Sequence, residues 1–287
     1  MEVATFGNDT GKRCGTCASI HRISVATLGA VPDDAGKTLG SSAGNLSISQ
    51  SVREILQTEA IRDPESGDPI TIWNAKSMFD AAQVPGYHPS RLAHVATAGQ
   101  VIVVTAPSWS STHATLRAYE RDGKGGWRQV VAATPARLGW SGLVPGSQRR
   151  QGTGKTPAGT YGIPSAFGRL ADPGTDLPYT QFDRNDAWTY NPDSPRTYNL
   201  FQKAPVSWRS FGGYVEHLWS HGRQYRYVAV MDFNLPDGAV RTGADGIRRA
   251  AKPANTRLGG GIFLHVTDGR STAGCLAIPQ GTMRRGL

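Results

Sequence analysis

The sequence predicts a mainly β fold for the larger, C-terminal part of the chain. After residue 98, runs of β-branched and aromatic residues alternate with turns rich in Gly, Asp and Pro. The chain of 287 residues also contains 35 Gly and 18 Pro, with 38% apolar residues, which is typical of a loop-rich β protein. This length predicts one good hydrophobic core with an additional segment.

The first 97 residues have a different pattern. Residues 1–45 are rich in Gly, Ser, Asp and Thr, which predicts a poorly ordered stretch. Apolar residues then recur at helical spacing from Ile48 to Leu56 and predict one amphipathic helix, and a second short helix is expected over 75–82. We therefore divide the chain into an N-terminal segment, 1–97, and a domain, 98–287. A partial prodomain, a misread reading frame and a partner-binding segment explain the N-terminal part equally well.

Four runs predict strands in the domain, at residues 101–105, 114–119, 127–132 and 225–233. Together they predict a packed β-sandwich. Another strand-like run ends at His265. We expect this strand to lie centrally, with Cys275 in the loop at its edge, because a nucleophile needs a rigid support and an open side.

His265 and Cys275 lie ten residues apart and form a candidate catalytic pair. A free thiol has a pKa of about 8.5, so a cysteine nucleophile works best with a base within hydrogen-bond reach. Turn-forming residues at 268–269 and 271–272 would let the chain fold back between the two. Gly274 permits a close approach of substrate, and its amide is a candidate oxyanion donor. The alternative is a buried structural cysteine beside a satisfied histidine.

Four sequence blocks carry a resemblance to a known family. They are residues 150–161, 188–199, 217–219 with 225–234, and 262–278, in which Phe-Leu-His leads into Thr-Ala-Gly-Cys. In this order they resemble the L,D-transpeptidase catalytic domain (YkuD-like domain), particularly its actinobacterial branch. The resemblance implies an L,D-transpeptidase-like β-sandwich with short helices.

The resemblance also implies an activity. Cys275 would be the nucleophile and His265 the base of a peptidoglycan L,D-transpeptidase, and the Gly274 backbone would belong to the oxyanion hole. The thioester formed with a stem tetrapeptide would then give a 3→3 cross-link or be hydrolysed. Peptidoglycan stem peptides are the implied partner and the cell envelope is the implied location. No cofactor is expected.

Three further residues are candidates for shaping the substrate side or the loop. Thr272 is expected to orient the loop rather than react, and a turn hydroxyl bonded to backbone is the competing interpretation. Lys155 and Thr156 are expected to shape the cleft, since the resemblance places them on a substrate-side hairpin. They also look like part of a phosphate-binding loop, but Pro157 follows where a helix would have to propagate.

Metal binding is not expected. His217 and His221 are spaced to share a helix face, but the flanking sequence lacks the His-Glu-x-x-His order. His217 is instead expected to line the cleft, with an ordinary structural histidine as the alternative. Cys14 and Cys17 form a Cys-x-x-Cys pair that is compatible with a disulfide or with half of a zinc site, but no second pair exists to complete four zinc ligands, and a structural or accidental pair is expected. Cys275 is thus left as a free thiol.

The sequence departs from the family pattern in three places. Ala273 and Ala277 stand where many members have a second histidine and an arginine. The chain ends at Leu287, where the family usually continues through a helix and a closing strand, so we expect an incomplete C-terminal edge. These departures motivate a second hypothesis, a catalytically degenerate, non-enzymatic cell-wall-binding protein. A cysteine peptidase acting on proteins is a third.

The formal charge of +9 suits an anionic partner such as peptidoglycan stem peptides or wall polymers. Nucleic-acid recognition is not expected, because no basic patch with interleaved aromatic residues is present. No window approaches the roughly 20 apolar residues of a membrane span. The first residues lack the basic start and apolar run of a signal peptide, so an envelope location requires an export route that this N-terminus does not explain.

Overall fold

The computed structural model describes residues 22–27, 88–92 and 95–287. These residues form a mainly β structure with several sheets and a few short helices. The helices expected at 48–56 and 75–82 lie outside the described residues, as do Cys14 and Cys17. A strand at 22–27 is described within the stretch 1–45 whose composition predicts poor order.

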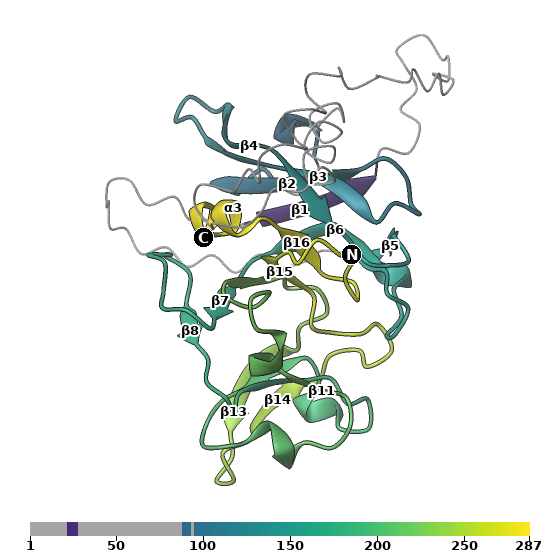
Figure 1. Ribbon diagram of the computed structural model, residues 1–287, viewed down its shortest axis with the longest axis vertical. Helices are drawn as coiled ribbons and strands as arrows, with labels where there is room; N and C mark the ends of the chain where they lie inside the picture. The colour runs from purple at the N-terminus through teal and green to yellow at the C-terminus, as the bar shows by residue number, and fades with distance from the viewer. Residues whose placement is uncertain (1–21, 28–87, 93–94) are drawn as a thin grey trace, which may run out of the picture.

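One eleven-stranded sheet forms the body of the molecule (Figure 1). In chain order its strands are β1 (Arg22–Thr27), β2 (Gln100–Ala106), β3 (His113–Arg121), β4 (Trp127–Arg137), β5 (Leu143–Pro145), β6 (Thr156–Gly162), β7 (Ser165–Gly168), β8 (Tyr179–Gln181), β12 (Val228–Val230), β15 (Phe263–Val266) and β16 (Leu276–Ile278). Their spatial order is β5-β6-β1-β2-β3-β4-β16-β15-β12-β7-β8. β1 pairs with β2 and β6, so the sheet includes a strand from before the expected boundary at residue 98.

The predicted strands agree with the sheet, with one difference. The runs at 101–105, 114–119 and 127–132 lie within β2, β3 and β4. The run at 225–233 was expected to be one strand, but only the three residues of β12 pair. Turns on both sides shorten it: Arg226 N donates to Arg223 O, and Leu235 N donates to Asp232 O.

Smaller elements surround this sheet. A three-stranded sheet consists of β9 (Ala187–Thr189), β10 (Leu200–Gln202) and β11 (Val215–His217), and a hairpin consists of β13 (Asp237–Thr242) and β14 (Arg248–Lys252). β11, β13 and β14 lie at the opposite end of the molecule from β2 and β3 (Figure 1). The helices are η1 (Pro89–Arg91), η2 (Gly146–Gln148), η3 (Pro195–Thr197), η4 (Trp208–Ser210), η5 (Leu218–His221) and α3 (Gln280–Gly286).

The main core lies between two halves of the large sheet. Apolar side chains of β2, β3 and β4 share one buried cluster with those of β7, β12, β15 and β16, so the two halves face each other as in a sandwich. A second cluster fills the space between the outer face of β7, β12 and β15 and the three-stranded sheet. A third covers the outer face of β2 and β3. The candidate catalytic residues belong to the strands between the first two clusters.

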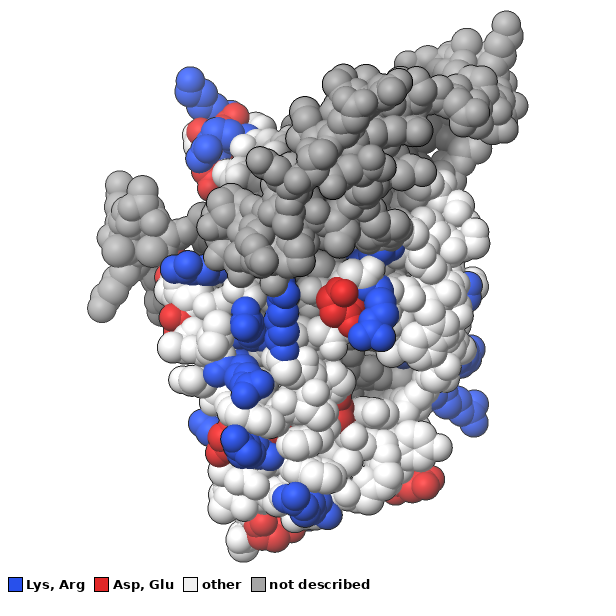
Figure 2. Space-filling model, in the orientation of Figure 1, with Lys and Arg blue, Asp and Glu red and all other residues white. Residues whose placement is uncertain are grey.

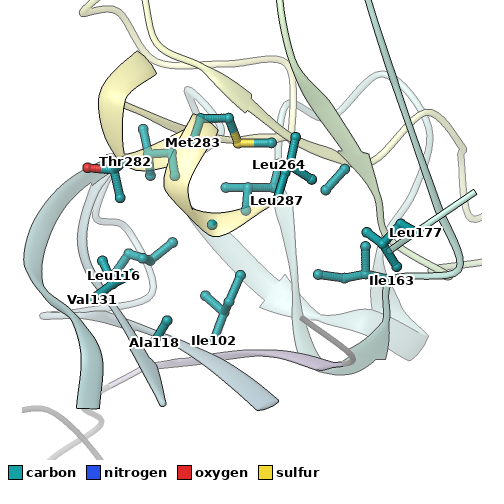
Figure 3. A pocket seen from close by; sticks show the side chains of 13 residues that line it. Ile102, Leu116, Ala118, Val131, Ile163, Leu177, Leu264, Thr282, Met283 and Leu287 are labelled. Atoms are coloured by element: carbon teal, nitrogen blue, oxygen red, sulfur yellow. The ribbon is translucent and has the colours of Figure 1, made fainter. Parts of the chain in front are cut away.

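α3 closes one end of the main core. Met283 and Leu287 lie beside Leu264 of one half of the sheet, and Leu116 of the other half lines the same small pocket across from them (Figure 3). Met283 is only 1% exposed. β16 lies inside the sheet, between β15 and β4, and the sheet ends at β5 and β8, so the incomplete C-terminal edge expected from the sequence stays a prediction.

Candidate active site

Cys275 and His265 lie on the same face of the β15–β16 pair. Leu264 and Leu276 belong to the main core on one face, whereas Phe263 and Cys275 belong to the cluster on the other. Successive side chains of a strand point to opposite faces. His265, two residues after Phe263, therefore shares the face of Cys275.

The strand register sets the separation of the pair. Leu264 pairs with Leu276 in parallel, so Cys275 lies beside Phe263 and one diagonal step from His265. Strands about 4.8 Å apart with a rise of about 3.3 Å per residue place these two Cα atoms about 8 Å apart. An imidazole and a thiol at this separation can reach each other through side-chain rotation.

The Cys275 thiol is hydrogen-bonded to backbone and is 8% exposed. Its Sγ donates to Gly261 O at 3.2 Å and accepts from Phe263 N at 3.4 Å. Among the residues that the structure describes, no hydrogen bond joins Sγ to the His265 ring. The structure therefore holds the candidate nucleophile and the candidate base near each other, while the thiol S–H is hydrogen-bonded to the carbonyl of Gly261.

His265 is held in one tautomer. The Nδ1 atom lies 2.9 Å from Val266 O, and a carbonyl can only accept, so Nδ1 carries the proton. The basic nitrogen is then Nε2. Burial, with a smaller contribution from nearby His221, lowers the pKa of His265 to about 4 against the opposing effects of Val266 O and Asp268. A neutral imidazole with a free Nε2 lone pair is the form that a general base requires.

The electrostatics keep the resting thiol protonated. Burial raises the pKa of Cys275 to about 12, and the Glu216 carboxylate adds to this increase. The Phe263 N–H and the Arg149 guanidinium act in the opposite direction, with smaller effects. At neutral pH the site thus holds a neutral thiol and a neutral imidazole, rather than an ion pair.

A second polar cluster adjoins the pair and was not predicted from the sequence. Tyr225 Oη donates to Glu216 Oε1, and His221 Nε2 lies 3.1 Å from the same oxygen. The His221 ring stacks on Tyr225 at 4.4 Å, and Tyr225 packs edge-on against His265 at 5.4 Å. Burial raises the pKa of Glu216 to about 7. The sequence signal for this cluster is weak, because Glu216 lies in a strand of three residues, which is too short for a periodic pattern.

Two threonines hold the carbonyl of Cys275. Thr272 Oγ1 donates to it at 2.7 Å, and Thr156 Oγ1 donates to it at 3.4 Å. Thr156 Oγ1 also accepts from Gly139 N at 2.8 Å. Thr272 thus bonds to backbone and fixes the turn, and Thr156 clamps the same peptide from β6.

The position directly before Cys275, Gly274, requires glycine, both for its backbone conformation and for lack of space. Its φ is +134°, and a Cβ there would lie 2.9 Å from Lys155 O and 3.1 Å from Arg149 Nη2. Its amide donates to Thr272 Oγ1 at 3.1 Å, so the oxyanion donor expected at Gly274 is already engaged. The Cys275 amide is the remaining backbone candidate.

Lys155 lies beside this turn through its backbone rather than its charge. Its carbonyl faces Gly274, whereas its Nζ donates to Ser141 O at 2.6 Å. Thr156 begins the strand β6 instead of a helix, so the segment lacks the strand–loop–helix geometry of a phosphate-binding loop.

His217 is turned toward a different neighbourhood. Its Nε2 lies 3.0 Å from Arg184 O, and its ring stacks on Trp208 at 4.5 Å. No described contact joins it to Cys275. Among the described residues, no group of three or more His, Cys, Asp or Glu is arranged to hold a metal ion.

Asn199 supports the backbone segment whose carbonyl accepts the hydrogen bond from the Cys275 thiol. Its Oδ1 accepts from Gly261 N at 2.8 Å and from Trp188 Nε1 at 2.9 Å. Its Nδ2 donates to Asn234 O at 2.6 Å and to Phe233 O at 3.3 Å. This fully bonded, buried amide fixes the position of Gly261 O, the acceptor for Cys275.

Comparisons with family models, with curated proteins and with solved structures gave no match to this chain. None of the helices in the described ranges has the length and apolar character needed to cross a membrane. Lys and Arg side chains are spread along the face seen in Figure 2 rather than gathered in one patch.

Proposed function

We propose that the protein is a peptidoglycan L,D-transpeptidase of the cell envelope. The observation that carries the proposal is the placement of Cys275 and His265 on one face of two adjacent strands, with Nε2 of His265 as the basic nitrogen. The four sequence blocks that resemble the L,D-transpeptidase catalytic domain support the same assignment. Two of these blocks, 150–161 and 262–278, are in contact at the Cys275 turn.

In the first half-reaction, Cys275 Sγ attacks the carbonyl carbon of the L,D bond before the terminal D-amino acid of a tetrapeptide stem. The thiol proton passes to Nε2 of His265 as the S–C bond forms. The tetrahedral intermediate then collapses and the C–N bond breaks. His265 returns the proton to the departing amine, which leaves a thioester on Cys275.

In the second half-reaction, an amine of a neighbouring stem attacks the thioester. His265 Nε2 takes a proton from this amine, and the tetrahedral intermediate expels sulfur, which recovers the proton. The product is a 3→3 cross-link. Water in place of the amine gives hydrolysis of the same bond, so both outcomes use one acyl-enzyme.

A carbapenem is the reagent that tests this proposal, because it resembles the acyl donor and traps the thiol. The intact mass of the purified protein should increase by one carbapenem. The increase should disappear in Cys275→Ala and persist when Cys14 and Cys17 are both replaced by Ser. His265→Gln should slow adduct formation at least about a hundredfold, because general-base catalysis typically contributes that much. Absence of an adduct on folded wild-type protein would contradict the proposal.

The alternative is a catalytically degenerate protein that binds the cell wall. The observation that favours it is the thiol itself, which is buried, bonded to backbone and raised in pKa. This alternative predicts that the protein sediments with purified peptidoglycan, that Cys275→Ala leaves this binding unchanged, and that no carbapenem adduct forms. Turnover of a tetrapeptide donor would exclude it.

A further inference from the structure

Arg149 is a buried cation beside the candidate nucleophile. It follows η2 and is only 4% exposed. Its Nε donates to Lys155 O at 3.1 Å, and its Nη1 donates to Leu258 O at 2.7 Å. The sequence alone does not indicate its role, because a single arginine in a loop carries no periodic signal.

No carboxylate neutralises Arg149 among the described residues. Both of its hydrogen bonds end on backbone carbonyls, and no ion pair between described residues includes it. Removing a guanidinium from water without a counter-charge is unfavourable, because its favourable hydration is lost. A buried guanidinium without a counter-charge is therefore expected at a site that binds an anionic ligand.

The unused donor of Arg149 faces the Cys275 turn. Nη2 makes no hydrogen bond to a described residue, and it lies 3.1 Å from the position that a Cβ on Gly274 would occupy. The charges of Arg149 and Cys275 also affect each other's pKa. Nη2 is thus positioned beside the residue that precedes the nucleophile.

The chemistry of the proposed donor identifies the anion. A stem that ends one residue beyond the scissile carbonyl carries a free α-carboxylate on the departing amino acid. One residue of extended chain spans about 3.5 Å, so this carboxylate must bind close to the nucleophile. A guanidinium binds carboxylates through charge-assisted hydrogen bonds, and Glu216, whose charge acts on Cys275, is engaged by Tyr225 and His221 instead.

We propose that Arg149 forms a carboxylate-binding subsite for the terminal α-carboxylate of the acyl donor. The subsite selects donors whose chain ends one residue after the bond that Cys275 attacks. This inference rests on the proposed function for the identity of the donor, but the existence of the carboxylate subsite can be tested without peptidoglycan.

The test compares two alkylating reagents at Cys275. Iodoacetate carries a carboxylate and iodoacetamide does not, so the ratio of their rate constants reports on the subsite, while the amide reagent alone reports on thiol access and ionisation. Rates are measured at Cys275 by peptide mass spectrometry, at pH 8 to 9. The iodoacetate-to-iodoacetamide ratio should fall at least about tenfold in Arg149→Gln, because a charge-assisted contact is lost. It should remain near the wild-type value in Arg149→Lys.

Arg150→Gln is the matched control, because it removes the same charge from an exposed neighbour. Its ratio should stay within about twofold of wild type, since an exposed charge is screened by solvent. An equal fall in Arg150→Gln and Arg149→Gln, or an unchanged ratio in Arg149→Gln, would overturn the subsite.

A measurement on the wild-type protein covers the case in which Arg149 variants fail to fold. D-Alanine should protect Cys275 from iodoacetamide, and D-alanine amide, which lacks the carboxylate, should not. Equal protection by the two, or no protection by either, would overturn the subsite.

The two proposals fail separately. A carbapenem adduct with an unchanged reagent ratio would retain the transpeptidase and remove the subsite. A ratio that depends on Arg149 without any adduct would retain the subsite and remove the transpeptidase.

Discussion

At the scale of single residues, the candidate site depends on backbone atoms as much as on side chains. The carbonyl of Gly261 accepts a hydrogen bond from the Cys275 thiol, the carbonyl of Val266 fixes the His265 tautomer, and two threonine hydroxyls fix the carbonyl of Cys275. Backbone acceptors cannot be altered by changing their own side chains. The residues that constrain the backbone are therefore the useful targets, and Gly274 is the first of them.

Replacing Gly274 with Ala should disturb both the fold and the nucleophile. A Cβ at φ +134° is strained and would lie 2.9 Å from Lys155 O. We expect a loss of about 1–3 kcal/mol in the free energy of unfolding, measured in urea, and slower carbapenem acylation. Gly269→Ala is the control, because its φ is +92° but no atom lies within 4 Å of the added Cβ. Equal effects of the two substitutions would contradict the contact with Lys155.

Part of this residue-level picture could be predicted from the sequence. The spacing of His265 and Cys275, with turn formers between them, predicted that the chain folds back, and the two strands are adjacent. Arg149 and Glu216 could not be predicted in the same way. Each lies more than 50 residues from Cys275 along the chain, and a single charged residue in a loop or a short strand carries no periodic signal.

At the scale of elements, short pieces of chain hold the site together. β11 and η5 bring Glu216 and His221 against Tyr225, which precedes β12 and contacts His265. The strand patterns of β2, β3 and β4 were visible in the sequence, whereas that of β13, with six residues, was not. Three-residue strands such as β9 to β12 are too short for an alternating pattern to stand out. The sequence therefore predicted one long strand at 225–233, where the structure has one short strand between turns.

The Glu216 cluster should make stability depend on pH. Folding raises the pKa of Glu216 from 4.5 to about 7, so its stabilising contribution is complete below pH 4.5 and is lost as the pH rises through 7. The free energy of unfolding of the wild type, minus that of Glu216→Gln, should therefore decrease by about 3 kcal/mol across this range. His265 has the opposite sign, since its lowered pKa contributes stability that is lost as the pH falls through 4, but it is present in both proteins and cancels.

Urea unfolding at several pH values measures this difference. Asp193→Asn, which alters an exposed carboxyl group, should show no comparable trend relative to wild type. A constant difference between wild type and Glu216→Gln from pH 4 to pH 8 would mean that the Glu216 carboxyl ionises normally.

At the scale of the whole molecule, one continuous sheet folds over its own core and α3 closes the open end. The mainly β class followed from turn-rich composition and strand periodicity. The pairing of β1 with β2 and β6 did not, because strand partners distant in sequence leave no local pattern. The position of α3 was also missed, since a seven-residue helix is shorter than the periodicity that identifies helices.

Met283→Ala should destabilise the entire domain. Met283 is almost fully buried between the two halves of the sheet, and its truncation leaves a cavity in the main core (Figure 3). We expect a loss of about 2–5 kcal/mol in the free energy of unfolding, measured in urea. Arg284→Ala, at the exposed neighbouring position of the same helix, should change it by less than about 0.5 kcal/mol. Equal effects would show that α3 does not close the core.

The strand β16 joins the two halves of the sheet, and Cys275 is the residue immediately before it. Leu276 and Ile278 fill the main core from this strand, while Cys275 faces outward. A slip of one residue would exchange these faces, placing the thiol in the core and a leucine in the site. The alternation of side chains that fills the core therefore also sets the direction of the Cys275 thiol. A substitution that shifted the register of β16 would change the reactivity of Cys275 before it changed the overall fold.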